Sequence, residues 1–458
     1  MSEKYDVIIV GCGAGGLFAS YELTKLGSSK RVLVLEKGYG LEERKCPISE
    51  GLTPKCLKCN PCHIMNGYGG AGTLSDGKYN ITTEFGGELH LKIGVKQAME
   101  LMEYVDSVLV GMSQGDTKLY STADSTLKTE ALRNNLYLLD ARVRHFGTDG
   151  NRIILKKMFD YIKENIDIRF NDTVTEVRKT QTGFEVSTSK QESFECDDLV
   201  LACGRSGSKW LGEVMAGFGV ELKSDRVDIG LRVELRAEIW KHITDVVYES
   251  KIVYKTDKYN DTVRTFCMNP YGKVVAENTN GIVTVNGHSY ADLALQTQNT
   301  NFALLVTNRF TEPFKNSNEY GESIAKLSNM LGGGVLMQRF GDLVKGRRSS
   351  EKRMEKSFTH PTLAATPGDL SLVMPKRQLD DIIEMVYQLD KIAPGTSNDD
   401  TLLYGVEVKF YNSEVEVDEN LETTIPGLYA IGDGSGVTHS LSQASASGVH
   451  IARHIAGK

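Results

Sequence analysis

The sequence has no long apolar run, no excess of basic residues and no sign of a leader segment. None of its apolar runs approaches the roughly 20 residues that a membrane-spanning helix needs. With 53 lysines and arginines against 60 aspartates and glutamates, the net charge is −7, which disfavours a nucleic-acid or anionic membrane surface as the main partner. The only apolar run near the N-terminus is strand-length, so no signal peptide is expected. These absences predict a cytoplasmic protein that acts on a small molecule, with no nucleic-acid partner and no membrane span.

Length and cysteine content set further limits. At 458 residues the chain is too long for one compact core, and two domains are expected because single domains usually hold about 100–200 residues. The eight cysteines are expected to be metal ligands, redox groups or core residues, since structural disulfides are rare in the cytoplasm. No internal repeat or low-complexity tract is visible.

An apolar strand, a glycine-rich turn and a second strand open the chain. The strand Tyr5–Val10 runs into the turn Gly11–Gly16, and the second strand, Arg31–Glu36, ends on an acid. In this order the glycines permit a tight turn, close approach of a pyrophosphate and close helix packing, while the acid accepts hydrogen bonds from an adenosine ribose. The helix that begins near Ala14 directs its N-terminal amides at the diphosphate. The residues expected to bind a dinucleotide here are Gly11, Gly13, Ala14, Gly16, Glu36 and Lys37.

A similar strand and glycine turn lie near the end of the chain. Residues 426–436 read Pro-Gly-Leu-Tyr-Ala-Ile-Gly-Asp-Gly-Ser-Gly and lead into a helix of small residues at about 441–455. This segment resembles the C-terminal strand of the glutathione-reductase-type FAD superfamily, which returns to the N-terminal nucleotide fold. The resemblance implies that Gly432 and Asp433 lie at the ribityl chain of FAD and that the following helix faces the flavin pyrimidine.

Two more segments fit the same superfamily. The strand 198–204 resembles its Ala-Thr-Gly strand and ends at Gly204, with Cys203 in place of the threonine. Val174, at the start of the preceding hairpin, matches the position whose backbone contacts adenine. Together with the N-terminal turn, the resemblance implies that the dinucleotide is FAD. No second nucleotide fingerprint is present, so no dedicated NAD(P)H domain is expected.

Several motifs narrow the resemblance. They are Arg44–Pro47, the cysteines described below, Gly69–Lys78, His145–Asp149, Gln338–Gly341 and Gly346–Arg348. Together they are similar to a family of largely uncharacterised microbial FAD-dependent dehydrogenases, and the similarity runs over almost the full length. It implies an FAD-dependent oxidoreductase that transfers hydride between the flavin and a small organic substrate. The segment Gly436–Ser442 departs from the plainer glycine-rich turn of many relatives.

Four cysteines lie within 17 residues: Cys46, Cys56, Cys59 and Cys62, in the spacing C-x9-C-x2-C-x2-C. This spacing lets the thiolates converge on one zinc ion or iron-sulfur cluster. Their position after the second strand fits instead a redox cysteine pair that exchanges electrons with FAD. A third interpretation gives these cysteines neither role. A cluster or a dithiol would make the chain a flavin-linked redox relay with a protein electron donor or acceptor.

The glycine-rich loop Gly67–Lys78 follows the cysteines directly. Glycine carries no Cβ, so its backbone can approach a bulky ligand closely. We expect this loop to wrap the flavin or its diphosphate, with Gly70 and Gly72 in contact with the cofactor.

Two features of the middle region suit a substrate site. His288, in the motif Asn286–Tyr290, is a candidate proton donor beside a reduced flavin. The adjacent Arg347 and Arg348 could hold a carboxylate or phosphate in bidentate fashion. His288 and Arg348 are therefore the predicted catalytic residues.

The expected fold class is α/β, with a discontinuous Rossmann-like FAD-binding domain and an inserted β-rich α+β substrate domain. The FAD-binding domain is expected at 1–85, 145–225 and 400–458, a helical segment at 86–144, and the inserted substrate or cap domain at 226–399. Alternation of apolar and polar residues predicts antiparallel strands in the insertion. Helical patterns lie at about 92–109, 126–139 and 151–164.

Overall fold

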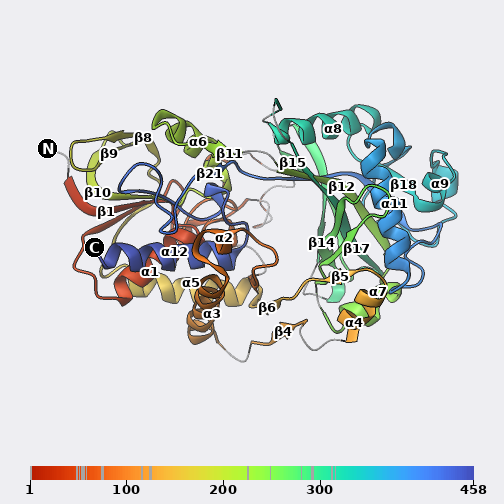
Figure 1. Ribbon diagram of the computed structural model, residues 1–458, viewed down its shortest axis with the longest axis horizontal. Coiled ribbons are helices and arrows are strands. Elements are labelled where there is room, and N and C mark those ends of the chain that lie inside the picture. Colours follow the sequence, from red (N-terminus) through yellow and green to blue (C-terminus); the bar gives the residue numbers. More distant parts are fainter. Residues whose placement is uncertain are drawn as a thin grey trace. The chain divides into compact units, whose positions relative to one another are not determined.

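The computed structural model divides the chain into two compact units (Figure 1). Unit 1 comprises Met1–Leu119, Ala141–Lys223 and Asn412–Lys458, and unit 2 comprises Tyr120–Asp140 and Ser224–Tyr411. The structure describes residues 3–47, 50, 52, 57, 59–73, 77–114, 117–122, 126–223, 226–247, 249–279, 281–289, 293–310, 313–314 and 316–458. Each unit has its own sheet and its own core.

Unit 1 alternates strands and helices, as a dinucleotide fold requires. Its strands are β1 (Glu3–Val10), β2 (Val32–Leu35), β3 (Lys78–Ile81), β6 (Arg142–His145), β7 (Asp167–Arg169), β8 (Val174–Lys179), β9 (Phe184–Thr188), β10 (Ser193–Leu201), β11 (Leu222–Lys223), β21 (Glu414–Val415) and β22 (Leu428–Ala430). Its helices are α1 (Ala14–Lys25), α2 (Leu89–Ile93), α3 (Val95–Met112), α5 (Gly147–Ile162), α6 (Ser208–Gly217) and α12 (Leu441–Ala456), with short 3-10 turns η1 (Leu41–Glu43), η2 (Gly70–Gly72), η3 (Arg205–Gly207) and η6 (Asp433–Ser435).

The main sheet of unit 1 is seven-stranded in the order β7-β2-β1-β10-β9-β8, with β22 paired to the other half of β10. The pairs β7 with β2, β2 with β1, β1 with β10 and β10 with β22 are all parallel. Such parallel strands are apolar on both faces because helices cover both sides, and Val32–Leu35 is buried throughout. The predicted α/β class with a Rossmann-like sheet is confirmed by this topology.

Helices α1 and α12 lie side by side against this sheet (Figure 1). Small residues allow the close approach. A Cβ added to Gly448 of α12 would lie 2.1 Å from the backbone oxygen of Gly15 in α1. The first helix of the chain therefore packs directly against the last one, and the N-terminal ends of both helices lie at the same edge of the sheet.

Unit 2 is built on an antiparallel sheet in the order β19-β18-β20-β12-β17-β14-β13-β5. Its strands are β5 (Tyr137–Leu138), β12 (Arg226–Arg236), β13 (Ile252–Lys255), β14 (Thr262–Asn269), β15 (Lys273–Thr279), β16 (Ile282–His288), β17 (Asn299–Arg309), β18 (Leu336–Arg339), β19 (Thr366–Pro367) and β20 (Leu402–Phe410). Its helices are α4 (Thr126–Arg133), α7 (Ala237–Thr244), α8 (Ser317–Gly332), α9 (Phe340–Val344), α10 (Glu351–Met354) and α11 (Lys376–Asp390), with 3-10 turns η4 (Leu293–Leu295) and η5 (Leu370–Leu372). The short strand β4 (Leu119–Ser121) spans the boundary between the units.

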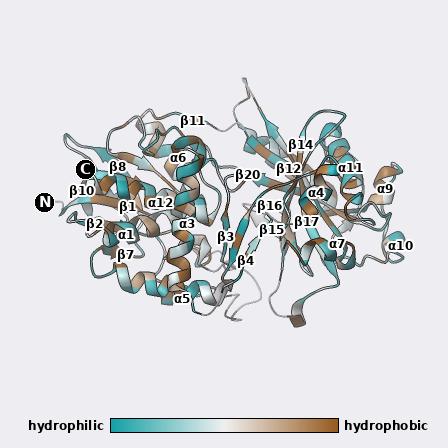
Figure 2. Cartoon of the chain, turned by 60° about the horizontal axis from the view of Figure 1, so that its bottom comes forward, coloured by the Kyte–Doolittle hydropathy of each residue, from teal (hydrophilic) through white to brown (hydrophobic). Residues whose placement is uncertain are grey.

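The central strand β12 shows how unit 2 is packed. Its alternate residues Val227, Ile229, Leu231, Val233 and Leu235 are fully buried in an apolar core that also includes residues of α7 and α11. Figure 2 colours each residue of the cartoon by its hydropathy. No described helix has both the length and the apolar character needed to cross a membrane.

The opposite face of β12 is polar and equally buried. The guanidinium of Arg232 forms two hydrogen bonds of 2.6 Å with the carboxylate of Glu407 on β20. It also donates to the Cys267 backbone oxygen at 2.9 Å and to the side-chain oxygens of Asn301 and Asn286 at 3.1 Å. We call this set the Arg232 cluster; it joins strands β12, β14, β16, β17 and β20.

The structure draws two boundaries differently from the sequence pattern. Strand β20 pairs with β12 and β18 in unit 2, whereas residues from 400 onward were expected in the FAD-binding domain. The helix expected at 126–139 ends at Arg133, because Asn135 adopts a left-handed backbone with φ of 55°. Left-handed residues commonly terminate helices. The following residues then pair with β13 as β5.

Asp381 of α11 is a buried carboxyl group in unit 2. Its side chain is fully buried, and neither oxygen has a hydrogen-bond partner in the described structure. Burial raises the pKa of Asp381 to about 6, and the neighbouring Asp261 carboxylate adds to the increase. An aspartate in an unfolded chain titrates near about 3.9. Because the folded pKa lies above the unfolded one, the native state loses stability as the pH rises from about 4 to about 6.

We therefore expect Asp381→Asn to raise the free energy of unfolding by about 1–2 kcal/mol at pH 7, with the gain vanishing near pH 4. Urea titrations from pH 4 to pH 8 measure this. The adjacent Asp380 is the matched control: burial opposes its ionisation, but Lys258 and Lys376 lower its pKa to about 2. Asp380→Asn should therefore lose stability at pH 7, and a loss of similar size in both variants would contradict the assignment.

Candidate functional site

The turn between β1 and α1 accepts only glycine at its first position. Gly11 has a φ of +102°, and a Cβ there would lie 2.4 Å from the backbone oxygen of Ala202 on the neighbouring strand. A Cβ on Gly16 would lie 2.0 Å from the Gly11 oxygen. The two glycines let β1, β10 and α1 meet closely, so the N-terminal amides of α1, starting at Ala14 after Gly13, stand at the edge of the sheet.

Glu36 lies at the end of β2 and its side chain is 5% exposed. One carboxylate oxygen accepts a hydrogen bond of 2.8 Å from the Cys12 backbone. The other accepts bonds of 2.8 Å from Gly38 and 2.9 Å from Gly67. Glu36 therefore fixes the glycine turn, the segment after β2 and the start of the glycine-rich loop relative to one another.

The glycine-rich loop packs directly on the beginning of α1. The Gly69 amide donates to the Cys12 oxygen at 2.8 Å, and a Cβ on Gly70 would lie 2.9 Å from the Cα of Gly13. At its far side, a Cβ on Gly72 would lie 2.7 Å from the side chain of Leu441, the first residue of α12. The described part of the loop thus lies between the N-terminal ends of α1 and α12, and its contact with the cofactor stays a prediction.

Arg44 holds this loop in place, and sequence reasoning missed its role. Its buried guanidinium donates to the backbone oxygens of Tyr68 at 2.6 Å and Gly70 at 2.8 Å and to the Thr73 hydroxyl at 2.7 Å. It also donates to the oxygens of His63 and Ile64, just after Cys62. Burial lowers the pKa of Arg44 to about 10, so the side chain is still charged at neutral pH. Only its place in the motif Arg44–Pro47 could have drawn attention to it.

Asp433 follows β22 and Gly432. Its carboxylate accepts a hydrogen bond of 2.7 Å from the Arg205 Nε and lies 3.2 Å from the Nδ1 of His439. Burial raises the pKa of Asp433, but the contact with His439 and the charge of Arg205 outweigh it, so the pKa is lowered overall. The turn η3, which begins after Gly204, packs on η6: a Cβ on Gly434 would lie 2.8 Å from the Gly204 oxygen.

Two of the remaining predicted contacts lie in the same region. Lys37 directs its Nζ to the backbone oxygen of Ser206 in η3, at 3.4 Å. Val174 is buried at the start of β8, a few residues after β7, and the intervening Asp172 amide donates to the Glu36 backbone oxygen at 3.1 Å.

The predicted dinucleotide residues therefore occupy one edge of the parallel strands. Glu36 follows β2, the turn Gly11–Gly16 follows β1, Gly204 follows β10 and Gly432 precedes Asp433 after β22. The carboxyl edge of such a sheet is where this fold binds dinucleotides. The structure brings together residues that are some 400 positions apart in the sequence.

The cysteine prediction is only partly covered by the structure. Cys46, Cys59 and Cys62 are described, and Cys56 lies outside the described residues. Among the residues that are described, no group of three or more histidine, cysteine, aspartate or glutamate side chains is placed to hold a metal ion. Cys59 and Cys62 form no disulfide there. A zinc ion, an iron-sulfur cluster or a dithiol at these cysteines stays a prediction.

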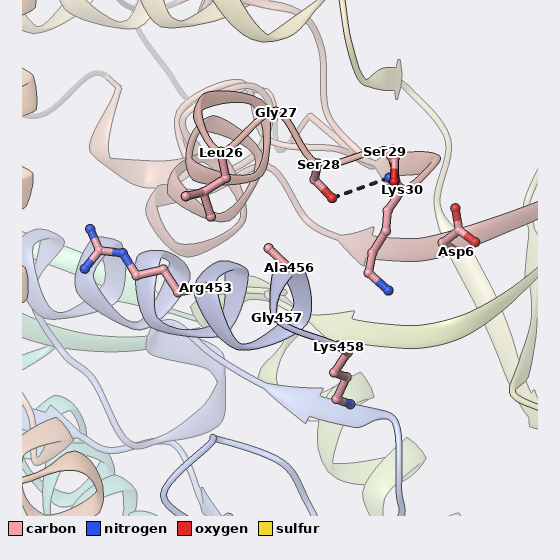
Figure 3. Close-up of a pocket in the computed structure, with 10 residues that line it drawn as sticks. All are labelled: Asp6, Leu26, Gly27, Ser28, Ser29, Lys30, Arg453, Ala456, Gly457 and Lys458. Atoms are coloured by element: carbon pink, nitrogen blue, oxygen red, sulfur yellow. Dashed lines mark hydrogen bonds between the residues drawn. The ribbon is translucent and has the colours of Figure 1, made fainter.

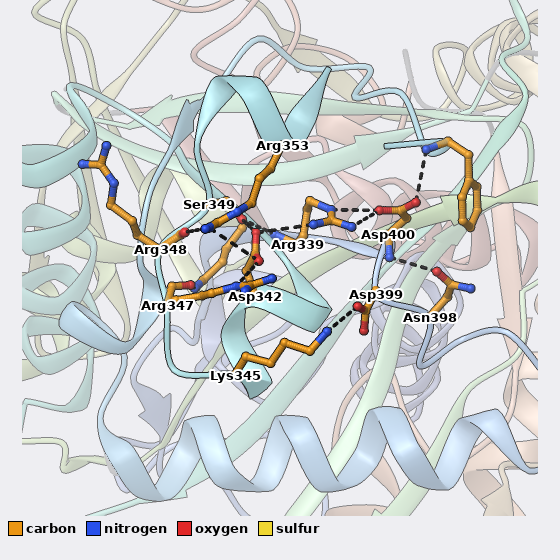
Figure 4. Close-up of polar contacts among 12 residues, drawn as sticks. Arg339, Asp342, Lys345, Arg347, Arg348, Ser349, Arg353, Asn398, Asp399 and Asp400 are labelled. Carbon is orange, nitrogen blue, oxygen red and sulfur yellow. Dashed lines mark hydrogen bonds and ion pairs between the residues drawn. The ribbon is translucent and has the colours of Figure 1, made fainter. Parts of the chain in front are cut away.

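The predicted catalytic residues belong to unit 2. His288 is exposed at the end of β16. Figure 4 shows Arg347 beside the buried Asp342: its Nε donates to that carboxylate at 2.7 Å, so part of its binding capacity serves an internal ion pair. Arg348 is exposed, and its backbone oxygen accepts a hydrogen bond of 2.7 Å from Arg353. Arg347 and Arg348 were predicted to hold a carboxylate or phosphate together. Of the two, the Arg348 side chain is directed away from the ion pair with Asp342 (Figure 4).

Figure 3 shows a surface depression of unit 1. It is lined by the connection between α1 and β2 and by the end of α12: Asp6, Leu26, Gly27, Ser28, Ser29, Lys30, Arg453, Ala456, Gly457 and Lys458. These residues flank the amino end of β1 and the C-terminal ends of both helices. The depression is therefore at the opposite edge of the sheet from the dinucleotide residues and is not part of that site.

One family model matches part of the chain. Residues 228–410 match the family model described as FAD-dependent protein, C-terminal domain-like. The match lies entirely within unit 2, the unit that does not contain the glycine turn. It supports the predicted FAD-dependent enzyme from a part of the chain independent of the N-terminal fingerprint. A search of curated proteins finds no match.

The solved structures with some likeness to this chain have low sequence identity to it. Glycine oxidase from Geobacillus kaustophilus is 12% identical, with 100% of this chain and 96% of that chain covered and a TM-score of 0.39. L-proline dehydrogenase from P. horikoshii is 13% identical, with coverage of 99% and 94% and a TM-score of 0.40. Sdh1 from Mycobacterium smegmatis is 14% identical, with coverage of 100% and 69% and a TM-score of 0.42. All three TM-scores lie below 0.5.

Proposed function

We propose that this chain is an FAD-dependent oxidoreductase that transfers hydride between the flavin and a small organic substrate. The observation that carries the proposal is the shared edge of unit 1, where Glu36, the turn Gly11–Gly16 and Asp433 follow three parallel strands of one sheet. A glycine turn with an acid after the second strand suits the ADP half of a dinucleotide. The second acid, at Asp433, suits the polyol half that distinguishes FAD from a nicotinamide dinucleotide. The family match over residues 228–410 supports the same cofactor.

The residues at this edge fit FAD. The adenosine would be held by Glu36, Lys37 and the backbone at Val174, and the diphosphate by the α1 amides at Gly13 and Ala14. Gly70 and Gly72 would line the diphosphate side. Asp433 would accept a hydrogen bond from the ribityl chain. The backbone is open where FAD has to approach it, because a Cβ on Gly204 or Gly432 would have no heavy atom within 4 Å.

Bound FAD supplies the hydride chemistry at its flavin ring. The chain's own residues hold and orient the cofactor: Arg44 keeps the glycine-rich loop against α1, and Glu36 fixes the loop's first residue. On the substrate side, His288 is proposed as the proton donor and Arg348 as the group that binds an anionic part of the substrate. The electron donor or acceptor that completes the cycle is either a small molecule or a protein.

A flavin-linked redox relay through Cys46, Cys56, Cys59 and Cys62 is the second candidate. One contact favours it: Arg44 ties the residues just after Cys62 to the loop that packs on α1. A thiol or cluster on this segment would stay close to the cofactor edge. Iron and zinc analysis of the purified protein tests the metal versions of the relay, and unchanged flavin reduction by substrate in Cys59→Ser would contradict the dithiol version.

Glu36→Gln tests the proposed cofactor site. An amide oxygen can accept in place of one carboxylate oxygen, but the NH2 group faces backbone amides that also donate. The ribose of FAD would also lose its charged acceptor, and losing such a charge-assisted bond costs about 1.5–3 kcal/mol, so we expect FAD to bind about 10–100-fold more weakly. Flavin fluorescence on titration of the apoprotein measures the affinity.

The control is Glu42→Gln, because Glu42 is an exposed acid of the same region that pairs with Arg152. It should bind FAD as the wild type does. Purified wild-type protein should be yellow and release about one FAD per chain on denaturation. Colourless protein that takes up no FAD on supplementation would overturn the proposal.

A further inference from the structure

His439 lies at the beginning of α12, in the segment that departs from the plainer turn of many relatives. It directly precedes the N-cap residue Ser440, whose hydroxyl accepts from the Gln443 amide. The His439 backbone amide donates to the Gly86 oxygen at 2.9 Å, which fixes the main chain. Its side chain is 12% exposed, so the imidazole is held by the protein and still reachable from outside.

Asp433 determines which way the imidazole faces. The Nδ1 of His439 lies 3.2 Å from one carboxylate oxygen, while the Nε of Arg205 donates to the other at 2.7 Å. One carboxylate therefore faces two groups that carry positive charge when protonated. Two other charged groups of the packed elements, Lys92 and Glu414, pair with each other at 3.0 Å. Arg205 balances the charge of Asp433, so a protonated His439 adds one positive charge to this group of three.

The position of the pair in the cofactor site follows from the order of the strands. Glu36, which suits the ribose of adenosine, follows β2, and the α1 amides that suit the diphosphate follow β1. Asp433 follows β22, on the other side of β1, and the N-terminal end of α12 packs against Gly72. The half of the dinucleotide that is not ADP therefore lies at Asp433 and the beginning of α12. In FAD this half carries the flavin ring.

We infer that His439, oriented by Asp433, supplies a positive charge that stabilises the negative charge gained by FAD on reduction. This inference rests on the proposed function. Uptake of two electrons and one proton adds one negative charge to the flavin, and a nearby cation favours that state over the neutral oxidised one. The partial positive charge at the N-terminal end of α12 acts in the same direction. His439 is thus a residue that sets the reduction potential, whichever substrate the enzyme uses.

His439→Asn tests this inference, because an asparagine amide can still donate to Asp433 but carries no charge. We expect the reduction equilibrium of bound FAD to shift at least tenfold towards the oxidised form, which corresponds to about 30 mV for a two-electron couple. Redox titration of the FAD-loaded protein against reference dyes, followed by absorbance, gives the potential without a substrate. His439→Lys restores the charge and should recover most of the shift.

The matched control is His450→Asn, since His450 lies on the same helix and its imidazole contacts the Glu419 backbone oxygen at 2.8 Å. The reduction potential of FAD bound to the His450→Asn variant should equal that of the wild type. An unchanged potential in His439→Asn, or a lysine variant that behaves like the asparagine variant, would overturn the inference while FAD binding still upholds the proposed function. Absence of bound FAD in the wild type would instead overturn the proposed function.

Discussion

Replacing Arg232 with methionine is expected to lower the free energy of unfolding of unit 2 by about 3–5 kcal/mol. The guanidinium is fully buried and forms two hydrogen bonds with Glu407, which is itself 5% exposed. Methionine keeps much of the volume but leaves the Glu407 carboxylate without its partner in an interior where water cannot replace it. The oxygens of Asn301 and Asn286 lose a donor at the same time.

The surroundings of Arg232 allow little relaxation. A Cβ on Gly287 would lie 2.5 Å from the guanidinium and 2.1 Å from the side-chain oxygen of Asn301, so the β15–β16 hairpin already packs tightly on the cluster. The five N–H groups of Arg232 are matched by acceptors on four other strands. Removing the side chain therefore removes hydrogen bonds that connect β12 to four other strands, β14, β16, β17 and β20.

Urea unfolding followed by the fluorescence of Trp240 measures this effect. The chain has two tryptophans, and in a Trp210→Phe background the signal comes from Trp240 alone, which is buried against Phe302 in unit 2. The control is the double variant Arg232→Met with Glu407→Leu. It removes both charges and should recover most of the lost stability, because apolar residues of similar volume often replace a buried ion pair at little cost. A double variant as unstable as the single one would contradict an origin in the unpaired charge.

The dinucleotide edge could be predicted from sequence because each of its parts is local. A strand, a glycine turn and an acid at a fixed distance are readable in the first 36 residues, and Gly432 with Asp433 repeats the strand and turn near the other end. The geometry of each turn depends on a few neighbouring residues. Joining the two ends needed the resemblance to a known superfamily, and the parallel pairing of β22 with β10 agrees with it.

The buried charges could not be predicted in the same way. Arg232 and Glu407 are 175 positions apart, and each sits in a strand whose alternation gives no sign that both faces are buried. The sequence places Arg44 in a motif but does not predict its hydrogen bonds. Its partners are backbone oxygens, and every residue type carries a backbone oxygen. The contact between His439 and Asp433 could not be predicted from the sequence either. The sequence showed only that the segment Gly436–Ser442, which contains His439, is unusual.

Two segments have a sequence pattern that is compatible with more than one structure, and their structures were predicted only in part. The pattern at 126–139 predicts a helix, but two successive asparagines end it. A left-handed Asn135 then turns the chain so that Tyr137 and Leu138 pair with β13. Strand β20 was recognised as a strand and expected in the other domain, since its apolar residues match either sheet. Whether such a segment forms a strand, and which sheet it joins, depends on the strand it pairs with. Tertiary packing determines that pairing more than intrinsic propensity does.

Gly11→Ala is expected to lower the affinity for FAD at least about 100-fold, the effect of roughly 3 kcal/mol. Alanine is strained at a φ of +102°, and its Cβ would lie 2.4 Å from the Ala202 backbone oxygen, so β1 and β10 must move apart or the turn must change its path. Either response displaces the amides at the beginning of α1 and the Cys12 amide that donates to Glu36. The diphosphate and ribose contacts are then weakened together.

Gly27→Ala is the matched control for this prediction. Gly27 also has a positive φ, of +63°, but a Cβ there meets no heavy atom within 4 Å, and the residue lies in the depression at the opposite edge of the sheet. It should cost about 1 kcal/mol of stability and leave FAD affinity unchanged. Flavin fluorescence titrations of the two apoproteins, with circular dichroism to show that both are folded, separate strain in general from loss of the turn. Equal FAD affinity in the two variants would show that the close contact between Gly11 and Ala202 does not control the cofactor site.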